Sequence, residues 1–374
     1  MFNKNYYVPI LKWKRAEQGA LETLTDECKD HLSPVIELVM PKVKSQFKDK
    51  EQKIKKTDGE IFQELITQFR DKRINEVPDE IIQSWGKRIA FIDFSLLYTK
   101  ELKVEAIKGI LEKGSRLGTK LVPILNLSDD EEIKKEMKAV SKIYGNGICI
   151  RIVSNDLDHP DELNRKIGDT IAFLDTKKEN IDLLVDIKEI DEVENRYLKY
   201  FNLAQEIKSL DEWRNFIFAS SAFPEDLSEC SVDEPKLLPR IEWTSWLEQR
   251  TKKTKRLPTF SDYTIRNPIY NESLQFFQST SSIKYTLEDE WLILKGKKKQ
   301  YEIYLASAAE LIKDNRFYGK NFCSGDKFIV EKGNHFENYI RDPKIKGTGN
   351  TEMWLKALIN HHLSLTTHQL ANLS

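Results

Sequence analysis

Between residues 8 and 263, short apolar runs alternate with longer segments whose apolar residues recur at helical spacing. The apolar runs span residues 8–14, 35–41, 89–95, 121–127, 148–154, 182–188, 215–221 and 258–263. Segments such as EAIKGILEKGSRLG and EEIKKEMKAVSKIYG lie between them and carry one apolar face. This order predicts parallel strands joined by crossover helices, in a sheet covered on both faces.

Eight strand and helix units are the number found in a (β/α)8 barrel. We therefore predict an α/β fold, a TIM-like (β/α)8 barrel, over residues 1–270. An open, doubly wound sheet is the competing architecture. That fold more often has a glycine-rich turn after its first strand, whereas KWKRAEQGAL (residues 12–21) contains a single glycine.

The pattern changes after residue 270, and we predict a C-terminal α+β extension over residues 271–374 that packs on the barrel. Residues 281–304 alternate as in a β-hairpin around an acidic turn. Residues 309–317 and 351–362 have helical spacing. Asn350 or Thr351, at the end of the flexible GTGN turn, is expected to cap the last helix.

A polar residue stands near the end of each predicted strand. In chain order these residues are Lys12, Glu37, Asp93, Asn126, Arg151, Asp186, Ser220 and Asp262. A barrel brings the carboxyl ends of all its strands to one mouth, so these side chains are expected to converge. The same residues also fit two purely structural roles, as solvated strand ends or as a self-neutralising network of charges.

Alternation along the strands indicates which side chains share a face. Lys12 and Lys14 share one face of the first strand, and Phe218 and Ser220 share one face of the seventh. If these faces point inward, Lys12, Lys14 and Ser220 look into the mouth, while Ser221 looks toward the helices.

The composition limits which binding partners and which cellular compartment fit this chain. The 59 Lys and Arg residues nearly balance the 60 Asp and Glu residues, which argues against a chain that coats nucleic acid. Basic segments at 41–56 and 249–256 leave nucleic acid open as a partner. The four cysteines form no CxxC pair, so neither a disulfide framework nor a zinc knuckle is predicted. No apolar run is long enough for a signal peptide or a membrane span, so we expect a cytoplasmic protein.

Several strings occur together in order: YVPILKWKRAEQGAL, SPVIEL, SSAFPEDLS, PRIEWTSW, FSDYTI, SIKYTLEDEWLILKGK, SGDKFI and the closing GTGN and MWLKALINHHLSL. From about residue 6 to residue 366, this set resembles the phage-associated "beta family" proteins, named after the Beta protein of a satellite phage. The satellite version belongs to a small gene cassette associated with defence against other phages. The resemblance therefore implies a role in phage–host conflict and a partner protein from the same cassette, but it implies no reaction.

The resemblance also marks individual positions. The matching residues are Lys12, Lys14, Glu37, Ser221, Phe223, Pro224, Glu225, Asp226, Asp262, Tyr263, Asn360, His361 and His362. The lysine-rich insertion after the second strand departs from typical members.

The first functional hypothesis is a metal-dependent, phosphodiesterase-like hydrolase. Its divalent cation, such as Mg²⁺ or Mn²⁺, would be held by four carboxylates, those of Glu37, Asp93, Asp186 and Asp262. Lys12, Lys14 and Arg151 would neutralise phosphate oxygens, and His361 would serve as a general acid or base. No HExxH or similar metal-binding spacing supports it.

The second hypothesis is a binding or sensor module, in which the mouth holds a phosphate-containing ligand without turnover. The ligand-binding positions are expected to be Asn126, Arg151, Ser220, Ser221, Glu225, Asp226, Tyr263, Asn360 and His362. Adjacent residues of a helix point about 100° apart, so at most one of His361 and His362 lines a given site.

Overall fold

The computed structural model describes residues 2, 5–41, 57–191, 195–232, 234–270, 280–298, 300–345 and 347–373. The basic segment at 41–56, apart from its first residue, lies outside these ranges. Within the described residues, no helix combines the length and the apolar character needed to cross a membrane.

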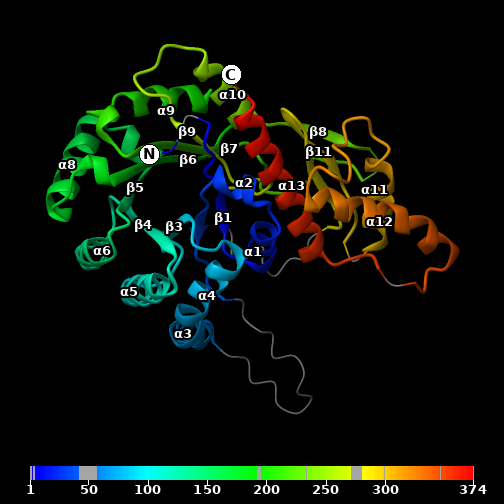
Figure 1. Ribbon diagram of the computed structural model, residues 1–374, viewed down its shortest axis with the longest axis horizontal. Coiled ribbons are helices and arrows are strands. Elements are labelled where there is room, and N and C mark those ends of the chain that lie inside the picture. The colour runs from blue at the N-terminus through cyan, green and yellow to red at the C-terminus, as the bar shows by residue number, and fades with distance from the viewer. Residues whose placement is uncertain are drawn as a thin grey trace.

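Within the described ranges, eight parallel strands form one sheet, in the order in which they occur along the chain (Figure 1). They are β1 (Ile10–Lys12), β2 (Val35–Glu37), β3 (Ile89–Asp93), β4 (Lys120–Asn126), β5 (Ile148–Val153), β6 (Ile181–Glu189), β7 (Asn215–Ser221) and β9 (Thr259–Ser261). The N–H groups of Val8 and Ile10 donate to the carbonyls of Phe260 and Asp262, at 3.0 and 2.8 Å. These bonds join the last strand to the first, and the predicted (β/α)8 barrel is confirmed.

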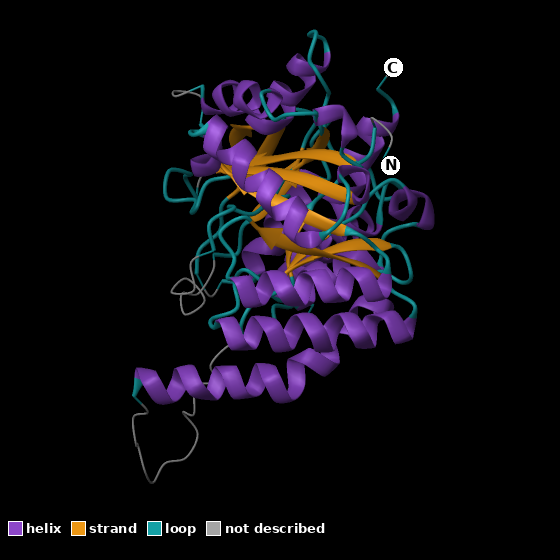
Figure 2. Cartoon of the chain, turned by 90° about the vertical axis from the view of Figure 1, so that its left-hand side faces the viewer, coloured by secondary structure: helices purple, strands orange, loops and turns teal. Residues whose placement is uncertain are grey.

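Helices cover the outside of the barrel (Figures 1 and 2). They are α1 (Arg15–Glu22), α2 (Asp26–Asp30), α3 (Asp58–Gln68), α4 (Ile74–Ser84), α5 (Lys100–Leu117), α6 (Glu131–Tyr144), α7 (Ser154–Leu157), α8 (Pro160–Leu174), α9 (Arg196–Gln205) and α10 (Ile241–Arg250), with a π-helical turn (Phe69–Arg73) between α3 and α4. Local signals set their ends. In α5, the Thr99 hydroxyl accepts from the N–H of Leu102, and Gly118 ends the helix at a φ of 80° that glycine adopts without steric cost.

The strand side chains point alternately into the barrel and toward the helices. The barrel interior is filled by apolar side chains that include Val35, Phe91, Ile124, Leu184, Ile217 and Ala219. Phe218 instead contacts Tyr197 and Phe201 of α9, with ring centroids 5.2 and 5.7 Å apart. The expectation that Phe218 and Ser220 lie on the inward face of β7 is therefore wrong. Every residue of β7 is buried, so hydrophobicity alone does not distinguish its two faces.

The C-terminal part begins with the predicted hairpin, which is confirmed: β10 (Ile283–Thr286) and β11 (Glu290–Leu294) are antiparallel. β8 (Lys236–Pro239), which precedes β9 in the sequence, pairs with β11, giving three strands in this sheet within the described residues. The helices are α11 (Glu302–Leu311), α12 (Ser324–Arg341) and α13 (Thr351–Ala371). Asn350 caps α13, as predicted, by accepting from the N–H of Met353 at 2.9 Å. α13 contacts α1 of the barrel and also β10 and α12, so it joins the two parts of the chain (Figure 1).

Candidate functional site

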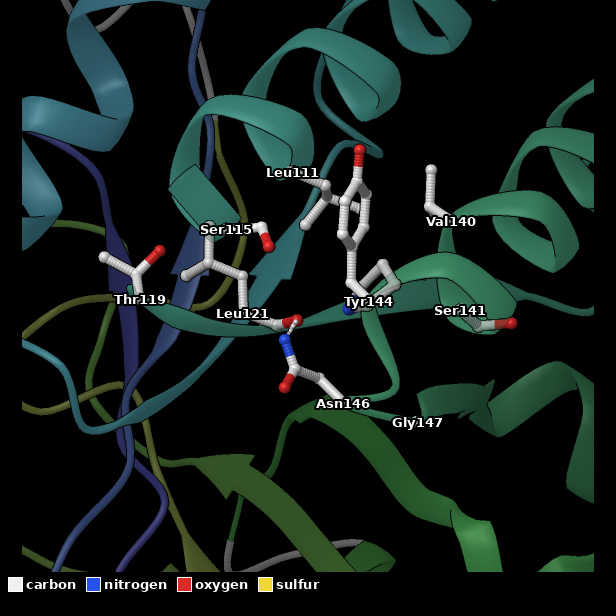
Figure 3. A pocket seen from close by; sticks show the side chains of 10 residues that line it. Leu111, Ser115, Thr119, Leu121, Val140, Ser141, Tyr144, Asn146 and Gly147 are labelled. Atoms are coloured by element: carbon white, nitrogen blue, oxygen red, sulfur yellow. Dashed lines mark hydrogen bonds between the residues drawn. The ribbon is translucent and has the colours of Figure 1, made fainter. Parts of the chain in front are cut away.

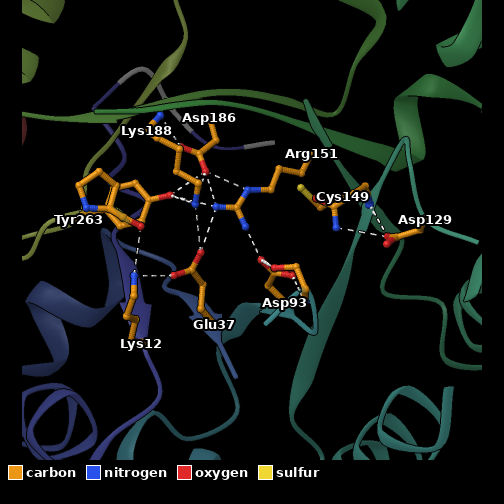
Figure 4. A network of polar contacts seen from close by, with 12 residues as sticks. Lys12, Glu37, Asp93, Asp129, Cys149, Arg151, Asp186, Lys188 and Tyr263 are labelled. Atoms are coloured by element: carbon orange, nitrogen blue, oxygen red, sulfur yellow. Dashed lines mark hydrogen bonds and ion pairs between the residues drawn. The ribbon is translucent and has the colours of Figure 1, made fainter. Parts of the chain in front are cut away.

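The carboxyl ends of the barrel strands bring a set of polar side chains together (Figure 4). We call this set the mouth network; its members are Lys12, Glu37, Asp93, Arg151, Asp186, Lys188 and Tyr263. The strand register places three of them at one level, because Lys12 pairs with Glu37 and Glu37 pairs with Asp93 on successive strands. The barrel topology therefore produces the predicted convergence for five of these residues: Lys12, Glu37, Asp93, Arg151 and Asp186.

Arg151 lies at the centre of the mouth network and binds carboxylates from three other strands (Figure 4). Its Nε donates to Asp186 at 2.9 Å, one terminal nitrogen donates to Glu37 at 3.0 Å, and the other pairs with Asp93. All four side chains are at most 3% exposed. A guanidinium group presents several donors in a fixed plane, so one arginine satisfies and orients all three acids.

The charges of the mouth network balance. Burial alone would raise the pKa of Glu37 and Asp186, but nearby cations hold the pKa of both carboxyl groups below the usual values. For Glu37 these cations are Lys12, Lys188 and Arg151, and for Asp186 they are Lys188 and Arg151. Burial raises the pKa of Tyr263 well above its usual value, so its hydroxyl keeps its proton and donates to Asp186 at 2.7 Å.

Lys188 is a member of the mouth network that the sequence reasoning missed. It follows Asp186 by two positions, and strand alternation could have placed both on the same face. The β6–β7 pairing shifts register between Asp186 and Glu189, and Lys188 has a φ of 60°, which is uncommon for a residue with a side chain. Its Nζ lies 2.7 Å from the Tyr263 hydroxyl. Its side chain is 28% exposed, more than that of any other charged member of the network.

Lys12, a member of the mouth network, and Lys14, beside the network, both lie near the ring of Tyr270. Lys12 makes two long contacts, 3.2 Å to Glu37 and 3.4 Å to the carbonyl of Pro268. Burial lowers its pKa. The ammonium groups of Lys12 and Lys14 lie 5.6 and 4.8 Å from the ring centroid of Tyr270, within reach of a cation–π interaction.

Two other predicted ligand-binding residues, Asn126 and Ser221, make local contacts, and a third, Ser220, faces outward. Asn126, at the end of β4, donates to Asp129 from its N–H and its side-chain amide, at 2.7 and 3.3 Å. The hydroxyl of Ser221 accepts from the N–H of Phe223 at 3.1 Å. Ser220 lies on the same face of β7 as Phe218. Because Phe218 packs against α9, the side chain of Ser220 points away from the mouth.

Glu225 and Asp226 are exposed in the loop that follows β7. The carboxylate of Asp226 accepts from the N–H of Ser228 at 2.7 Å, a bond within the loop itself. The structure therefore shows an Asx-type turn at Asp226.

Asp262 lies on the opposite side of the strand from the mouth network. Its neighbour Tyr263 points inward, whereas the Asp262 carboxylate accepts from Nε2 of His362 at 2.9 Å and from the hydroxyl of Tyr7. Nδ1 of His362 lies 3.0 Å from the hydroxyl of Thr286. The structure thus groups Asp262 with helix α13 and strand β10, and not with the other strand-end carboxylates.

Thr286, His362 and Asp262 connect a hydroxyl, an imidazole and a carboxylate in the order found in nucleophilic triads. However, all three side chains are completely buried, so a substrate has no route to the hydroxyl. Burial lowers the pKa of His362, which favours the neutral imidazole. This chain of contacts fastens α13 and β10 to the barrel.

The other two predicted site residues of α13, His361 and Asn360, have different neighbours. The ring of His361 stacks on Tyr285 with centroids 4.0 Å apart, and its Nδ1 faces Asp326. The side chain of Asn360 accepts from the N–H of Gly325 at 2.9 Å and donates to a carbonyl of α1 at 3.1 Å. His361 and His362 therefore face separate clusters, as their angular separation on the helix predicts.

A small pocket lies at the opposite end of the barrel, between α5, α6 and the start of β4 (Figure 3). Its volume is about 10 Å³, room for one water molecule, and its lining includes Leu111, Thr119 and Tyr144. None of the predicted site residues lines this pocket.

Comparison with known proteins gives a family and structural likenesses. A family model described as Beta protein matches residues 7–368. Among solved structures, a mutant tryptophan synthase alpha-subunit from Pyrococcus furiosus is 13% identical to this chain, with a TM-score of 0.36. The alignment covers 70% of this chain and 88% of the subunit. A second mutant of that subunit gives 13% identity, 70% and 89% coverage and a TM-score of 0.38. The search of curated proteins gave no match.

Proposed function

This chain belongs to the Beta protein family, and on that premise we propose that it is a phage-defence component whose barrel mouth binds a phosphate-containing ligand without turnover. The resemblance of its motifs to phage-associated proteins supports the defence role. The arrangement of charges in the barrel mouth supports the class of ligand.

The observation that carries ligand binding is the conformation of Lys188. A left-handed backbone at a residue with a side chain costs on the order of 1 kcal/mol, and such strain clusters at functional sites. Here the strained residue is also the most exposed charged member of the mouth network. Its ammonium group lies beside the buried ion pairs, 2.7 Å from the Tyr263 hydroxyl and 3.1 Å from the Asp186 carboxylate.

The surrounding charge favours an anion. The mouth network has three cations (Lys12, Arg151 and Lys188) and three carboxylates (Glu37, Asp93 and Asp186), and the ammonium group of Lys14 lies beside it. Ammonium groups with protons to spare form charge-assisted hydrogen bonds with phosphate oxygens. The rigid Arg151 layer beneath them would hold the lysines in place.

The same geometry supports binding over metal-dependent hydrolysis. Oxygen atoms of Glu37, Asp93 and Asp186 that would hold Mg²⁺ or Mn²⁺ are bonded to Arg151. A guanidinium cation at that place repels a divalent cation and occupies its ligands. Asp262, the fourth proposed ligand, faces His362.

We also propose that the protein acts in the cytoplasm with another protein of its gene cassette. All four cysteines are free, which suits a reducing compartment. The family resemblance supports the partner.

Isothermal titration calorimetry tests the ligand-binding proposal with inorganic phosphate, pyrophosphate and a panel of nucleotides. At least one probe is expected to bind the wild-type protein and to bind Lys188→Ala and Lys188→Gly about 10- to 100-fold more weakly, as expected for a lost charge-assisted hydrogen bond. Lys188→Gly relieves the backbone strain, so its loss of binding reports on the ammonium group alone. Lys199→Ala is the matched control, because Lys199 is an exposed lysine on α9 paired with Asp158.

Failure of every phosphate probe to bind the wild type, or equal binding to Lys188→Ala, would contradict the proposed ligand. Phosphodiester turnover that requires Mg²⁺ and is lost in Asp93→Asn would favour the hydrolase instead. Phage plating efficiency on cells carrying the cassette tests the defence role: protection is expected with the wild type and not with Lys188→Ala.

A further inference from the structure

Three side chains lie close together where the start of α12 meets α13: the thiol of Cys323, the carboxylate of Asp326 and the imidazole of His361. One ligand atom from each lies within 4.8 Å of the others. Nδ1 of His361 lies 4.0 Å from the sulfur of Cys323, and 3.0 and 3.2 Å from the two oxygens of Asp326. Ligand atoms around a tetrahedral zinc ion are about 3.3–3.6 Å apart, by its usual bond lengths. The cluster therefore has nearly the dimensions of a zinc site.

The hydrogen bonds of His361 orient its ring as a ligand. Nε2 lies 2.8 Å from the backbone carbonyl of Thr286, which can only accept a hydrogen bond. Burial would lower the pKa of His361, but Asp326 raises it to about 10, so without a metal ion Nδ1 is protonated as well. A Zn²⁺ ion would displace that proton; the ring then keeps its proton on Nε2, and Nδ1 presents a lone pair on the side of Cys323 and Asp326. Metal-bound histidines typically donate their other N–H to a carbonyl or carboxylate in this way.

Asp326 provides a second, independent observation. Its side chain is completely buried. Oδ1 lies 3.0 Å from Nδ1 of His361 but without the direction of a hydrogen bond, so it has no hydrogen-bond partner within the part of the chain that the structure describes. A buried carboxylate oxygen without a partner is costly, and a bound cation would satisfy it.

Cys323 supplies the third ligand. It is also the member of the cluster that solvent reaches. It is the N-cap of α12, and its sulfur accepts from the N–H of Asp326 at 3.4 Å. A cysteine binds a metal ion as the thiolate. Cys323 is partly exposed, whereas Asp326 and His361 are buried.

We propose that Cys323, Asp326 and His361 bind one Zn²⁺ ion through the sulfur, a carboxylate oxygen and Nδ1. No fourth His, Cys, Asp or Glu joins the cluster within the described residues, so a water molecule takes the remaining position. The ion joins the first turn of α12 to the middle of α13. These residues are separate from the mouth network, so this proposal does not depend on the proposed ligand.

The test is to strip the purified protein with a chelator and to titrate it with Zn²⁺ and, separately, with Co²⁺. We expect one ion per chain and a rise in melting temperature of about 3 °C when free Zn²⁺ is roughly 100-fold above its Kd. Bound Co²⁺ is expected to show a near-ultraviolet thiolate-to-metal charge-transfer band.

Cys323→Ser removes the thiolate and keeps a residue that caps a helix well, so it is expected to fold. In this variant and in Asp326→Asn, we expect Zn²⁺ affinity to fall by at least about 100-fold, more than the loss of an outer-shell partner causes. Cys230→Ser is the matched control, because Cys230 is a buried thiol outside the cluster, and it should bind Zn²⁺ as the wild type does.

Three results would overturn the zinc site: no stoichiometric metal binding by the wild type, equal Zn²⁺ affinity in folded Cys323→Ser, or a Co²⁺ spectrum without the thiolate band. Each would leave Asp326 and His361 as a buried ion pair that needs no metal.

Discussion

His362, on the last helix, donates a hydrogen bond from Nε2 to the carboxylate of Asp262, at the end of the last barrel strand, over 2.9 Å. Both side chains are completely buried. The same carboxylate accepts from the hydroxyl of Tyr7, which precedes the first strand. One buried acid thus connects the two ends of the barrel sheet to helix α13.

A double-mutant cycle measures this connection. His362→Ala is expected to lower the free energy of unfolding by about 3–5 kcal/mol, because it removes a partner from a buried carboxylate. Asp262→Ala removes the charge itself, so the double variant should lose less than the sum of the single changes, with a coupling of about 1–3 kcal/mol. Guanidinium denaturation followed by circular dichroism gives the values, and additivity within about 0.5 kcal/mol would contradict the coupling.

Arg151 is expected to contribute more to stability than any surface arginine. Arg151→Met leaves three buried carboxylates without their shared cation and should cost about 3–5 kcal/mol or more, measured by chemical denaturation. Arg151→Lys should be less destabilising, since it keeps the charge but loses the planar donors. Arg165→Met is the control: Arg165 is exposed and pairs with Asp169 on the same helix, so a change below about 0.5 kcal/mol is expected. If Arg151→Met lowered the free energy of unfolding by less than about 1 kcal/mol, the three carboxylates would not depend on this arginine.

The sequence predicted those members of the mouth network whose position follows from strand order alone. Glu37 and Asp93 end two consecutive parallel strands, and Arg151 lies near the end of β5, so a closed barrel must place them at one mouth. The sequence did not determine which of two adjacent residues points inward. Asp262 and Tyr263 follow a short strand that is buried throughout, so neither polarity nor hydrophobicity indicated that Tyr263 faces the mouth.

Partners from distant segments were beyond sequence reasoning. Helical geometry predicted that His361 and His362 face different ways, but their contacts come from Asp326 and Thr286, 35 and 76 residues away. Helix α12, which carries Asp326, was itself not predicted. Lys188 was missed for another reason: a register shift at the end of β6 places it, and local alternation only suggests its face.

Glu242, at the start of α10, predicts a pH dependence of stability. Burial, with a contribution from Asp262, raises the pKa of Glu242 to about 8, while Arg240 acts in the opposite direction. In the unfolded chain a glutamate titrates near about 4.3. Between these values the folded protein binds more protons than the unfolded chain, so this group lowers stability as pH rises, by up to about 1.4 kcal/mol per pH unit.

Glu242→Gln keeps the shape of the protonated acid and removes this titration. Its melting temperature relative to the wild type is therefore expected to rise steadily from about pH 5 to about pH 8. Glu248→Gln, at an exposed glutamate of the same helix, is the control and should follow the wild-type profile. If the melting temperatures of Glu242→Gln and the wild type changed with pH in parallel, Glu242 would titrate normally.

The same substitution at two glycines should have opposite effects. Gly325 lies where α12 meets α13, and a Cβ there would be 2.1 Å from the carbonyl oxygen of Ala357 and 3.2 Å from the backbone nitrogen of His361. Gly325→Ala must separate the helices and should cost about 1–3 kcal/mol, measured by chemical denaturation. Gly168, within α8, has open space around it, so Gly168→Ala should gain about 0.5–1 kcal/mol. Because Gly325 lies between Cys323 and Asp326, its substitution should also weaken Zn²⁺ binding, while Gly168→Ala leaves it unchanged. Wild-type stability in Gly325→Ala would mean that the two helices do not pack this closely.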